Sequence, residues 1–468
     1  MSALARYYRH EGYDVAGYDR TPSDLTRALE KESIRVSYDD DASQLPFAAE
    51  GLEVVWTPAV PKETALYRYL DSHGAHIHKR AEALGKITAM KKPLCVAGTH
   101  GKTTTSTMLA HLMKTANADF RISGFQDSKI NQGDGVNAFL GGISENYKTN
   151  LLLDSESPYV VVEADEYDRS FHHLRPFMSV VTSVDPDHLD IYGTPEAYQE
   201  SFEHYCSLVS DTLVLKYGLQ DRLRLSTQAR ILTYSSEDSR ADYYAANIIV
   251  KEGSIAFDLH HPGGRIEGVR LGVPVWVNIE NSIAAAAIAL QCGVSEDAVR
   301  EGLASFAGVH RRFNIHVQTA EIAYIDDYAH HPQEIAASIA SVRKLYPQRH
   351  LTGIFQPHLY TRTRDFADAF ATVLSTLDEV ILLPIYPARE EPIEGVNSEM
   401  LLEKIQAESR KKKEKSPNTQ AELLSKDELI EQIGERARQT APVAVLTIGA
   451  GDIDRLVPAI AEKLTNDN

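Results

Sequence analysis

A glycine-rich segment at residues 97–105 (AGTHGKTTT) has the residue types that hold a phosphate group. Its glycines allow the backbone to approach an anion closely, and the free N–H groups at the start of a following helix would point at that anion. Lys102 would lie against the outer phosphates of a nucleotide, and the hydroxyl group of Thr103 or Thr104 would face a magnesium ion. The segment therefore predicts a site for nucleotide phosphates and magnesium.

An ordinary strand-to-helix turn with a solvated lysine is the alternative for this segment. We discount it because an apolar run at residues 94–96 precedes the loop and residues 106–113 follow it with apolar side chains at helical spacing. These patterns predict a strand, a glycine loop and a helix, the order that a phosphate loop requires. The loop is more compact than the common Gly-x-x-x-x-Gly-Lys-[Ser/Thr] pattern, because Val96 stands where that pattern has its first glycine.

Two apolar segments that end in acidic residues predict further strands beside the loop. Residues 159–163 (YVVVE) end at Glu163, and residues 178–184 lead into the sequence DPDHLD at 185–190. An acid at the carboxyl end of a parallel strand beside a phosphate loop is where a magnesium ligand is needed, so we expect Glu163 to bind the metal. A solvated acidic turn is the alternative, and we prefer it for the later acids at positions 165, 166 and 168.

Other elements must position these residues. Residues 1–12 predict a helix that Gly12 ends, followed by a strand at 15–19 whose last residue, Asp19, could bind a sugar hydroxyl or lie in a surface turn. Residues 91–93 (KKP) are expected to form a linker before the loop. Residues 282–291 predict a helix ended by Gly293, and residues 322–332 predict a strand whose tip carries acids and histidines, with Pro332 opening the next helix. A strand and loop are expected at 54–60, further strands at 351–355, 379–385 and 443–448, short strands and turns between 211 and 275, and a loop at 129–135.

The composition is that of an ordinary globular protein, because 43% of the residues are hydrophobic and 24% are charged. The length of 468 residues suggests about three domains. The net charge of −18 argues against a nucleic-acid or anionic-membrane surface. Three distant cysteines fit buried free thiols in a reducing compartment. No apolar run approaches the length that spans a membrane, and no secretory leader is present, so we expect a cytoplasmic protein without membrane insertion. The lysine-rich run at 411–415 predicts a solvated surface.

Several motifs together resemble the Mur ligase family, the amide-forming enzymes of peptidoglycan precursor synthesis. They run in order along nearly the whole chain: GTHGKT at 98–103, DHLD at 187–190, NIEN at 278–281, RRF at 311–313, DDYAHHP at 326–332 and GAGD at 449–452. The sequence FQPHLYTRT at 355–363 is similar to a segment of the family's alanine-adding members. In those members arginine often stands where this chain has Leu359.

The resemblance implies a role for each matched residue. The ATP loop would comprise Gly98, Thr99, His100, Gly101, Lys102, Thr103 and Thr104. His188 would help Thr103 and Glu163 to hold magnesium, and no carbamate is expected because Ser201 lies near the position of a carbamylated lysine in several relatives. Asn278 and Asn281 would contact adenine and pack the ATP site, with helix capping as the alternative for Asn281. Arg312 would reach the ATP phosphates, unless the arginine pair is only a surface feature, and Asp327 would hold the ribose. Substrate binding would involve Asp19, Tyr328, His330, His358 and Arg362, and the catalytic set would be Lys102, Glu163, His188, Arg312 and His330.

The implied fold is α/β, with a Rossmann-like UDP-sugar domain at residues 1–91, a central P-loop ATPase domain at 92–313 and a Rossmann-like C-terminal domain at 314–468. In the implied reaction, ATP activates the carboxylate of UDP-N-acetylmuramate as an acyl phosphate, which the amine of L-alanine then attacks. A monomer or weak homodimer is expected. The rivals are a family member that recycles muramoyl peptides, a P-loop switch or kinase-like protein, and an inactive truncated form.

The beginning of the sequence also carries an expectation. In the alanine-adding members, the segment that resembles Met-Ser-Ala-Leu-Ala-Arg follows a first strand and a glycine-rich turn that holds the UDP diphosphate. The sequence predicts that the natural chain starts upstream of Met1. It also predicts that a chain beginning at Met1 binds UDP-N-acetylmuramate poorly while still binding ATP.

Overall fold

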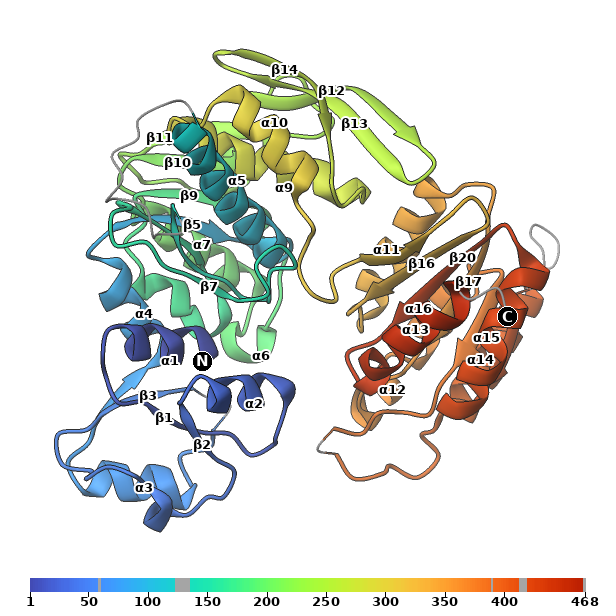
Figure 1. The fold of residues 1–468 in the computed structure, drawn as a ribbon, viewed down its shortest axis with the longest axis horizontal. Helices are drawn as coiled ribbons and strands as arrows, with labels where there is room; N and C mark the ends of the chain where they lie inside the picture. The colour runs from blue at the N-terminus through green and yellow to red at the C-terminus, as the bar shows by residue number, and fades with distance from the viewer. Residues whose placement is uncertain (58–59, 123–134, 389, 412–418, 466–468) are drawn as a thin grey trace. The chain divides into compact units, whose positions relative to one another are not determined.

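The computed structural model describes residues 1–57, 60–122, 135–388, 390–411 and 419–465. They form two compact units (Figure 1). The first unit contains Met1–Ala246, Leu259–Ile266 and Glu280–Leu303, and the second contains Asn247–Asp258, Glu267–Ile279 and Ala304–Asn468. Most of the loop expected at 129–135 and most of the basic run at 411–415 lie outside the described residues. The predicted α/β fold is confirmed, whereas the three domain boundaries stay a prediction.

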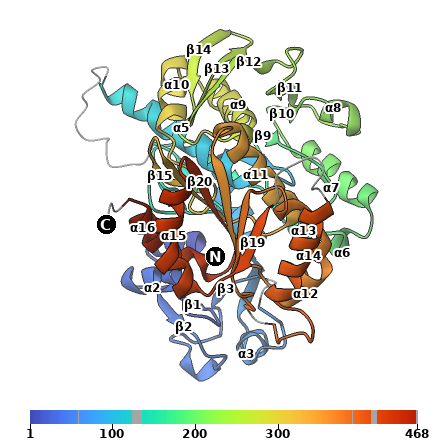
Figure 2. The same ribbon diagram turned by 90° about the vertical axis from the view of Figure 1, so that its right-hand side faces the viewer.

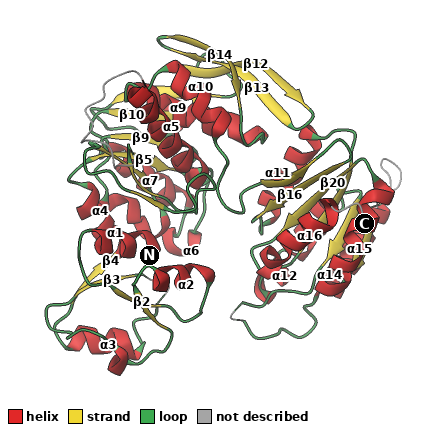
Figure 3. Ribbon diagram, viewed as in Figure 1, coloured by secondary structure: helices red, strands yellow, loops and turns green. Residues whose placement is uncertain are grey.

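The beginning of the first unit alternates short strands and helices (Figure 3). Strands β1 and β2 pair in parallel, as do β3 and β4. The predicted helix at the start of the chain is confirmed as α1. The elements are α1 Ser2–His10, β1 Ala16–Tyr18, α2 Asp24–Lys31, β2 Arg35–Ser37, the 3₁₀ helix η1 Ala42–Gln44, β3 Glu53–Trp56, α3 Ala65–Ser72, β4 His76–Lys79 and α4 Arg80–Thr88.

Helix α1 is anchored to a later part of the same unit. The Ser2 hydroxyl accepts a 3.0 Å hydrogen bond from the side-chain amide of Asn150, and Arg6 donates to the carbonyl oxygen of that amide. The rings of Tyr7 and Phe139 lie 5.5 Å apart. Helix α1 therefore packs against β6 (Asn137–Phe139) and against the segment just before β7 (Leu151–Leu152).

A large sheet forms the centre of the first unit. Strand β5 (Lys92–Ala97) lies between β8 (Tyr159–Glu163) and β9 (Met178–Val181), and pairs in parallel with both. The order continues as β11-β10-β9-β5-β8-β6-β7, with β10 at Thr212–Lys216 and β11 at Arg230–Ser235. Strands β12 Tyr243–Lys251, β13 Ser254–His261 and β14 Gly264–Arg270 extend the sheet beyond β11, and both units contain residues from them.

The linker predicted at residues 91–93 is wrong, because β5 already begins at Lys92. The backbone N–H of Lys92 donates to the carbonyl of Pro158, and the carbonyl of Pro93 accepts from Phe177. A proline near the start of a strand removes one donor but leaves its carbonyl free to pair, so it does not end the strand.

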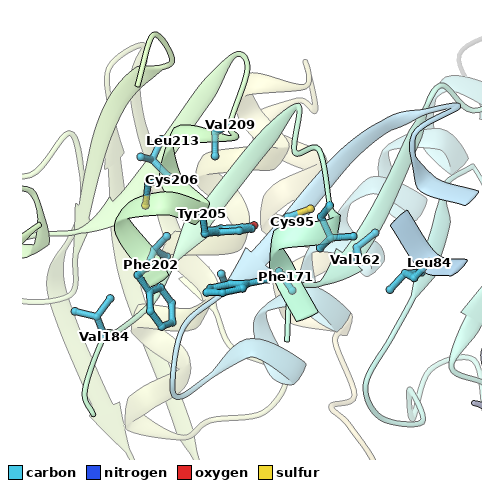
Figure 4. Packing of buried hydrophobic residues seen from close by; sticks show 14 of the residues in the cluster. Leu84, Cys95, Val162, Phe171, Val184, Phe202, Tyr205, Cys206, Val209 and Leu213 are labelled. Atoms are coloured by element: carbon cyan, nitrogen blue, oxygen red, sulfur yellow. The ribbon is translucent and has the colours of Figure 1, made fainter. Parts of the chain in front are cut away.

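Helices cover this sheet, and aromatic side chains contribute to the core between them. Phe171 stacks on Tyr205 with ring centroids 4.7 Å apart, and both pack with Cys95, Val162 and Phe202 (Figure 4). The prediction of buried free thiols is confirmed for Cys95 and Cys206, whereas the free thiol of Cys292 is half-buried; burial raises the pKa of the Cys95 thiol to about 12. The helical elements are α5 Lys102–Ile122, the 3₁₀ helix η2 Tyr167–His173, α6 Leu189–Tyr192, α7 Pro195–Ser207, α8 Leu219–Arg222, α9 Trp276–Gln291 and α10 Glu296–Ser305.

The second unit is a doubly wound sheet whose strands lie in the order β15-β16-β20-β17-β18-β19. All pairs except β15 with β16 are parallel. Figure 2 shows α13 and α14 on one face of this sheet and α15 and α16 on the other. The strands are β15 Asn314–Gln318, β16 Ile322–Asp327, β17 His350–Phe355, β18 Glu379–Leu382, β19 Gln420–Leu423 and β20 Val443–Ile448. The helices are α11 Pro332–Leu345, α12 Tyr360–Asp365, α13 Ala367–Leu374, α14 Ser398–Lys411, α15 Lys426–Thr440, the 3₁₀ helix η3 Asp452–Leu456 and α16 Val457–Thr465.

Strand β20 is the last strand in sequence but lies between β16 and β17. The carboxyl ends of three strands are thereby neighbours, and they carry Asp327, Gly449 and Gln356. Ligands of open α/β sheets bind at this edge, so the topology assembles a candidate site from three separate motifs. In the parts of the chain that the structure describes, no helix is long and apolar enough to cross a membrane.

Candidate active site

The glycine loop joins β5 to α5, as predicted, and two of its glycines are required by their surroundings. Gly98 has a φ of +133°, and a Cβ atom there would lie 2.1 Å from the hydroxyl of Thr182. Gly101 has a φ of +79° and precedes the first residue of α5. The loop is held to the end of β9, because Thr182 donates to the carbonyl of His100 and the N–H of His100 donates to Ser183. The backbone N–H groups at the start of α5 thus stand where a phosphate loop needs them.

Lys102 pairs with Glu166, a residue that the sequence predicts to lie in a solvated turn. Its Nζ lies 2.7 Å from Oε2 of Glu166, and it also donates to the carbonyls of Gly98 and Thr99. Glu166 is 2% exposed, so the interpretation of this residue as a solvated acid is wrong. The error arises because Glu166 follows the strand tip by three residues, and the chain then folds back through left-handed backbone at Asp168 and Arg169.

Glu163 lies at the tip of β8, where the sequence predicts it. Burial raises the pKa of its carboxyl, although the positive charge of Lys102 and a hydrogen bond from Thr103 partly oppose that shift. Its Oε2 atom is buried without a hydrogen-bond partner. A Cβ atom on Gly141 would lie 2.1 Å from this oxygen, so only glycine leaves space for it. An unpaired buried carboxylate oxygen beside a threonine hydroxyl is suited to a hard cation.

Among the described residues, the side chain of His188 lies beside Glu166 and Asp187 rather than beside the predicted metal ligands Glu163 and Thr103. Its Nε2 lies 4.0 Å from Oε1 of Glu166 and 3.7 Å from Oδ2 of Asp187, and its ring packs edge-on against Tyr167. Within the described ranges, no group of three or more histidine, cysteine, aspartate or glutamate side chains is arranged to hold a metal ion. Magnesium usually takes one or two protein carboxylates and completes its shell with phosphate oxygens and water, so two protein ligands fit it.

Asn278 and Asn281 lie inside α9, which begins at Trp276 rather than near residue 282 as predicted. The alternative that Asn281 caps the helix is therefore wrong, because a capping residue lies outside the helical turns. Instead, Oδ1 of Asn281 faces Gly101, where it would be 2.8 Å from an added Cβ atom. Asn278 donates from its side-chain amide to the carbonyl of Val273. Asn281 therefore packs against the loop, and the contact of Asn278 and Asn281 with adenine stays a prediction.

The two arginines of the RRF motif have different environments in the second unit. Arg311 is buried, donates to the carbonyl of Gly449 at 2.5 Å and lies 3.6 Å from Asp326. Arg312 is exposed, and its guanidinium lies 5.5 Å from the ring centroid of Tyr328. Arg311 is therefore fixed by the fold, whereas Arg312 presents its guanidinium to solvent as a phosphate-binding residue must.

Asp327 ends β16 with a buried carboxylate. The hydroxyl of Ser338 in α11 donates to it. Burial raises the pKa of Asp327 to about 6, and the bond from Ser338 and the charge of Arg312 oppose the shift. A carboxylate in this position can accept hydrogen bonds from sugar hydroxyls, as the sequence predicts for the ATP ribose.

Four of the predicted substrate-binding residues gather beyond β16 and β17. The rings of Tyr328 and His330 are 5.4 Å apart, and those of His330 and His358 are 6.2 Å apart. Arg362 donates to Nδ1 of His358 at 3.2 Å. Burial, reinforced by the positive charge of Arg362, lowers the pKa of His358 to about 4. Burial also lowers the pKa of His330, whose Nδ1 donates to the carbonyl of Tyr328, so its Nε2 remains an acceptor.

A polar frame around Gln356, at the carboxyl ends of β17 and β20, is not among the functional residues that the sequence predicts. Gln356 accepts from the N–H of Ile453 and donates to Asp452, which also pairs with Lys426 at 2.5 Å. A Cβ atom on Gly451 would lie 2.5 Å from Oε1 of Gln356. The FQPH and GAGD sequences were the available signal, but only the strand order brings them together.

Two further predicted positions stand apart from these clusters. Asp19 is exposed after β1, and its Oδ1 accepts from the N–H of Thr21, which is the geometry of a surface turn. Its sugar-binding role stays a prediction. The hydroxyl of Ser201 lies 3.0 Å from Nε2 of His172 inside the core of the first unit.

Comparison with known proteins links these clusters to one family. The family models described as "Mur ligase family, catalytic domain", "Mur ligase middle domain" and "Mur ligase, glutamate ligase domain" match residues 1–92, 96–289 and 311–451. A relative from Porphyromonas gingivalis strain W83, named UDP-N-acetylmuramate–L-alanine ligase, is 50% identical over 99% of this chain and 96% of its own length. A relative of the same name from Parabacteroides distasonis is 49% identical over 99% of this chain and 95% of its own.

A solved structure shares the fold over the whole chain. The UDP-N-acetylmuramate–alanine ligase of Thermotoga maritima superimposes with a TM-score of 0.78 at 24% identity, covering 100% of this chain and 97% of that one. At this identity the likeness describes the fold. The α/β fold of this chain is therefore shared with an experimentally determined protein.

Proposed function

This chain belongs to the Mur ligase family, and we propose that it is the ATP-dependent ligase that joins L-alanine to the carboxylate of UDP-N-acetylmuramate in peptidoglycan precursor synthesis. The observation that carries the proposal is the 50% identity over 99% of the chain with a relative named for this reaction. The order of the motifs and their positions at strand ends support it. ADP, phosphate and an amide are the products.

The reaction requires activation because a carboxylate is a poor electrophile. In the first step, a carboxylate oxygen of the sugar substrate attacks the γ-phosphorus of ATP, and the bond from that phosphorus to the bridging oxygen of ADP breaks. In the second step, the amine of L-alanine attacks the acyl carbon, inorganic phosphate leaves, and the amine loses a proton. Charge on the transferring phosphoryl group must be offset throughout.

Residues at the glycine loop of the first unit and at the strand ends of the second unit suit phosphate binding and substrate binding. In the first unit, backbone N–H groups of the glycine loop and the ammonium of Lys102 would hold the phosphates. In the second unit, Arg312 would contribute a planar guanidinium that suits phosphate oxygens, and Asp327 would hold the ribose. His330 and Arg362 would serve the amino-acid end, where Arg362 can pair with the carboxylate of L-alanine.

The residues near the loop also fit magnesium. Thr103 and the unpaired Oε2 of Glu163 would hold the ion, and His188 would act beside Glu166. When bound, magnesium neutralises phosphate charge and polarises the γ-phosphoryl group. The role of Thr103 and Glu163 would be to fix the ion beside the loop.

The recycling ligase of the same family is the second candidate, because it shares the ATP loop and the strand-tip acids. The sequence FQPHLYTRT and the names of the relatives favour the alanine enzyme. We also propose that the enzyme acts in the cytoplasm, where ATP and the nucleotide sugar are present, as a monomer or weak homodimer.

The test is release of inorganic phosphate from ATP in the presence of UDP-N-acetylmuramate, measured for one amino acid at a time and for the tripeptide L-alanyl-γ-D-glutamyl-meso-diaminopimelate. L-Alanine is expected to give the fastest release. Release with the tripeptide alone would contradict the proposal and support the recycling activity, and release without any added amino acid or sugar would indicate a simple ATPase.

A further inference from the structure

Glu166 is a buried charged residue to which the reaction scheme assigns no part. It lies between β8 and η2, with 2% of its side chain exposed. Its carboxylate contacts Lys102 through both oxygens, at 2.9 Å and 2.7 Å from Nζ. Its backbone carbonyl accepts a 2.5 Å hydrogen bond from the hydroxyl of Tyr192. The residue is therefore fixed from both its main chain and its side chain.

The partner of Glu166 is the residue that the nucleotide phosphates require. Lys102 is 13% exposed, and its remaining contacts go to two carbonyls of its own loop, those of Gly98 and Thr99. Three acceptors therefore occupy an ammonium group that has three N–H donors. Outer phosphates can bind Lys102 strongly only if at least one of these acceptors gives way, and the carboxylate is the acceptor that carries a full charge.

The imidazole of a second residue, His188, lies near the same carboxylate. Nε2 of His188 is 4.0 Å from Oε1 of Glu166, just beyond hydrogen-bond distance. The same Oε1 accepts from Lys102 at 2.9 Å, so the carboxylate that holds Lys102 also lies near a second residue of the catalytic set.

We propose that Glu166 is a positioning residue that competes with the nucleotide phosphates for Lys102 and, once displaced, turns to His188. This inference rests on the proposed function. In the absence of nucleotide, Glu166 keeps the lysine folded onto the loop. When ATP binds, Lys102 exchanges the carboxylate for phosphate, and Glu166 orients the imidazole of His188 for the reaction.

The proposal predicts opposite effects on binding and turnover for Glu166→Gln. This variant keeps the shape and a hydrogen-bond acceptor but removes the charge that holds Lys102 and repels phosphate. ATP should bind about tenfold more tightly, whereas kcat should fall about tenfold because His188 loses its charged partner. A merely structural role would instead weaken ATP binding and turnover together.

Isothermal titration calorimetry with ATP, ADP and adenosine measures the binding part in the full chain. Adenosine lacks phosphates, so its affinity should be unchanged in Glu166→Gln. Glu166→Asp retains the charge but retracts it from Lys102, and its ATP affinity should lie between those of the wild type and Glu166→Gln. The matched control is Asp168→Asn, which removes a charge from the same segment, where Asp168 pairs with Lys79 at 3.0 Å. Its ATP affinity should stay within about twofold of the wild type.

The outcomes separate this inference from the proposed function. Failure of the wild-type protein to bind ATP would contradict the proposed function itself. Wild-type binding together with unchanged or weaker ATP affinity in both Glu166 variants would overturn the competition. Equal tightening by Asp168→Asn would also overturn it, because the effect would then be one of general charge.

Discussion

Oδ1 of Asn281 lies against Gly101, 2.8 Å from the position that a Cβ atom would take, so a side chain from α9 packs against the phosphate loop. The contact joins residues that are 180 positions apart in the sequence. It gives Gly101 two reasons to be glycine, since its φ of +79° also lies in the left-handed region.

Replacing Gly101 with alanine should therefore disturb both the backbone and the packing by Asn281. We expect ATP affinity to fall at least tenfold, with a loss of about 1–3 kcal/mol in unfolding free energy. Gly193→Ala is the matched control, because Gly193 has a φ of +82° and nothing within 4 Å of an added Cβ atom. Titration with ATP and chemical unfolding of both variants measure the difference. Equal loss of ATP affinity in the two variants would contradict a role for the packing of Asn281 against Gly101.

The unpaired oxygen of Glu163 predicts a dependence on magnesium. Glu163→Gln should raise the magnesium concentration needed for half-maximal activity about tenfold or more, since a neutral amide is a weaker ligand for a hard cation. His188→Ala should lower turnover with a smaller change in that concentration, because the imidazole lies 4.0 Å from Glu166. Activity is titrated against magnesium for both variants. An unchanged magnesium requirement in Glu163→Gln would contradict the placement of the ion.

The two neighbouring arginines should separate stability from activity. Arg311→Lys cannot reproduce the contacts to the carbonyls of Gly449 and Gly451 and to Asp326, so we expect a loss of about 2–4 kcal/mol in unfolding free energy. Arg312→Lys should unfold like the wild type but lose at least tenfold in kcat/KM for ATP. Chemical unfolding and steady-state kinetics measure the two effects. The reverse assignment of effects would show that Arg311 is the residue that reaches phosphate.

Asp327 predicts how nucleotide binding depends on pH. Its pKa is raised to about 6, so the carboxyl is mostly neutral below that pH and accepts hydrogen bonds from the ribose hydroxyls less strongly than a carboxylate does. ATP affinity should therefore fall as the pH drops from 7 to 5. Ser338→Ala removes a donor that stabilises the charged form, so it should move the midpoint of this fall to higher pH. A midpoint unchanged in Ser338→Ala would mean that another group controls the fall.

The same shift sets the sign of a stability effect. The folded protein holds the Asp327 proton at pH values where the unfolded chain has lost it, between about 4 and 6. The contribution of this group to the unfolding free energy is therefore fully present below pH 4 and is lost as the pH rises through 6. Comparing wild type with Asp327→Asn by urea unfolding between pH 4 and 7 measures it.

Local patterns were sufficient for the elements that carry the chemistry. The strand, loop and helix around Lys102, the strand tips at Glu163 and Asp327, and the helix that starts at Pro332 follow from apolar periodicity and from glycine and proline positions. Each of these signals lies within about fifteen consecutive residues. Interactions between residues close in the sequence determine these elements, so the sequence alone is sufficient to predict them.

Contacts between distant segments could not be predicted in the same way. Lys102 and Glu166 are 64 positions apart, and no local pattern of residue types predicts a contact at that separation. The frame around Gln356 depends on the insertion of β20 between β16 and β17. Strand order is a property of the whole sheet, and one sequence contains no local record of it.

The direct test of the central claim is the fate of oxygen from the substrate carboxylate. UDP-N-acetylmuramate labelled with ¹⁸O at both carboxylate oxygens is incubated with ATP, magnesium, L-alanine and the enzyme, and the released phosphate is analysed by mass spectrometry. Transfer of the γ-phosphoryl group to the carboxylate predicts one ¹⁸O atom in each phosphate formed and one retained in the amide. Amide product accompanied by unlabelled phosphate would contradict an acyl phosphate, and labelled phosphate that forms equally well without L-alanine would contradict the ligase reaction.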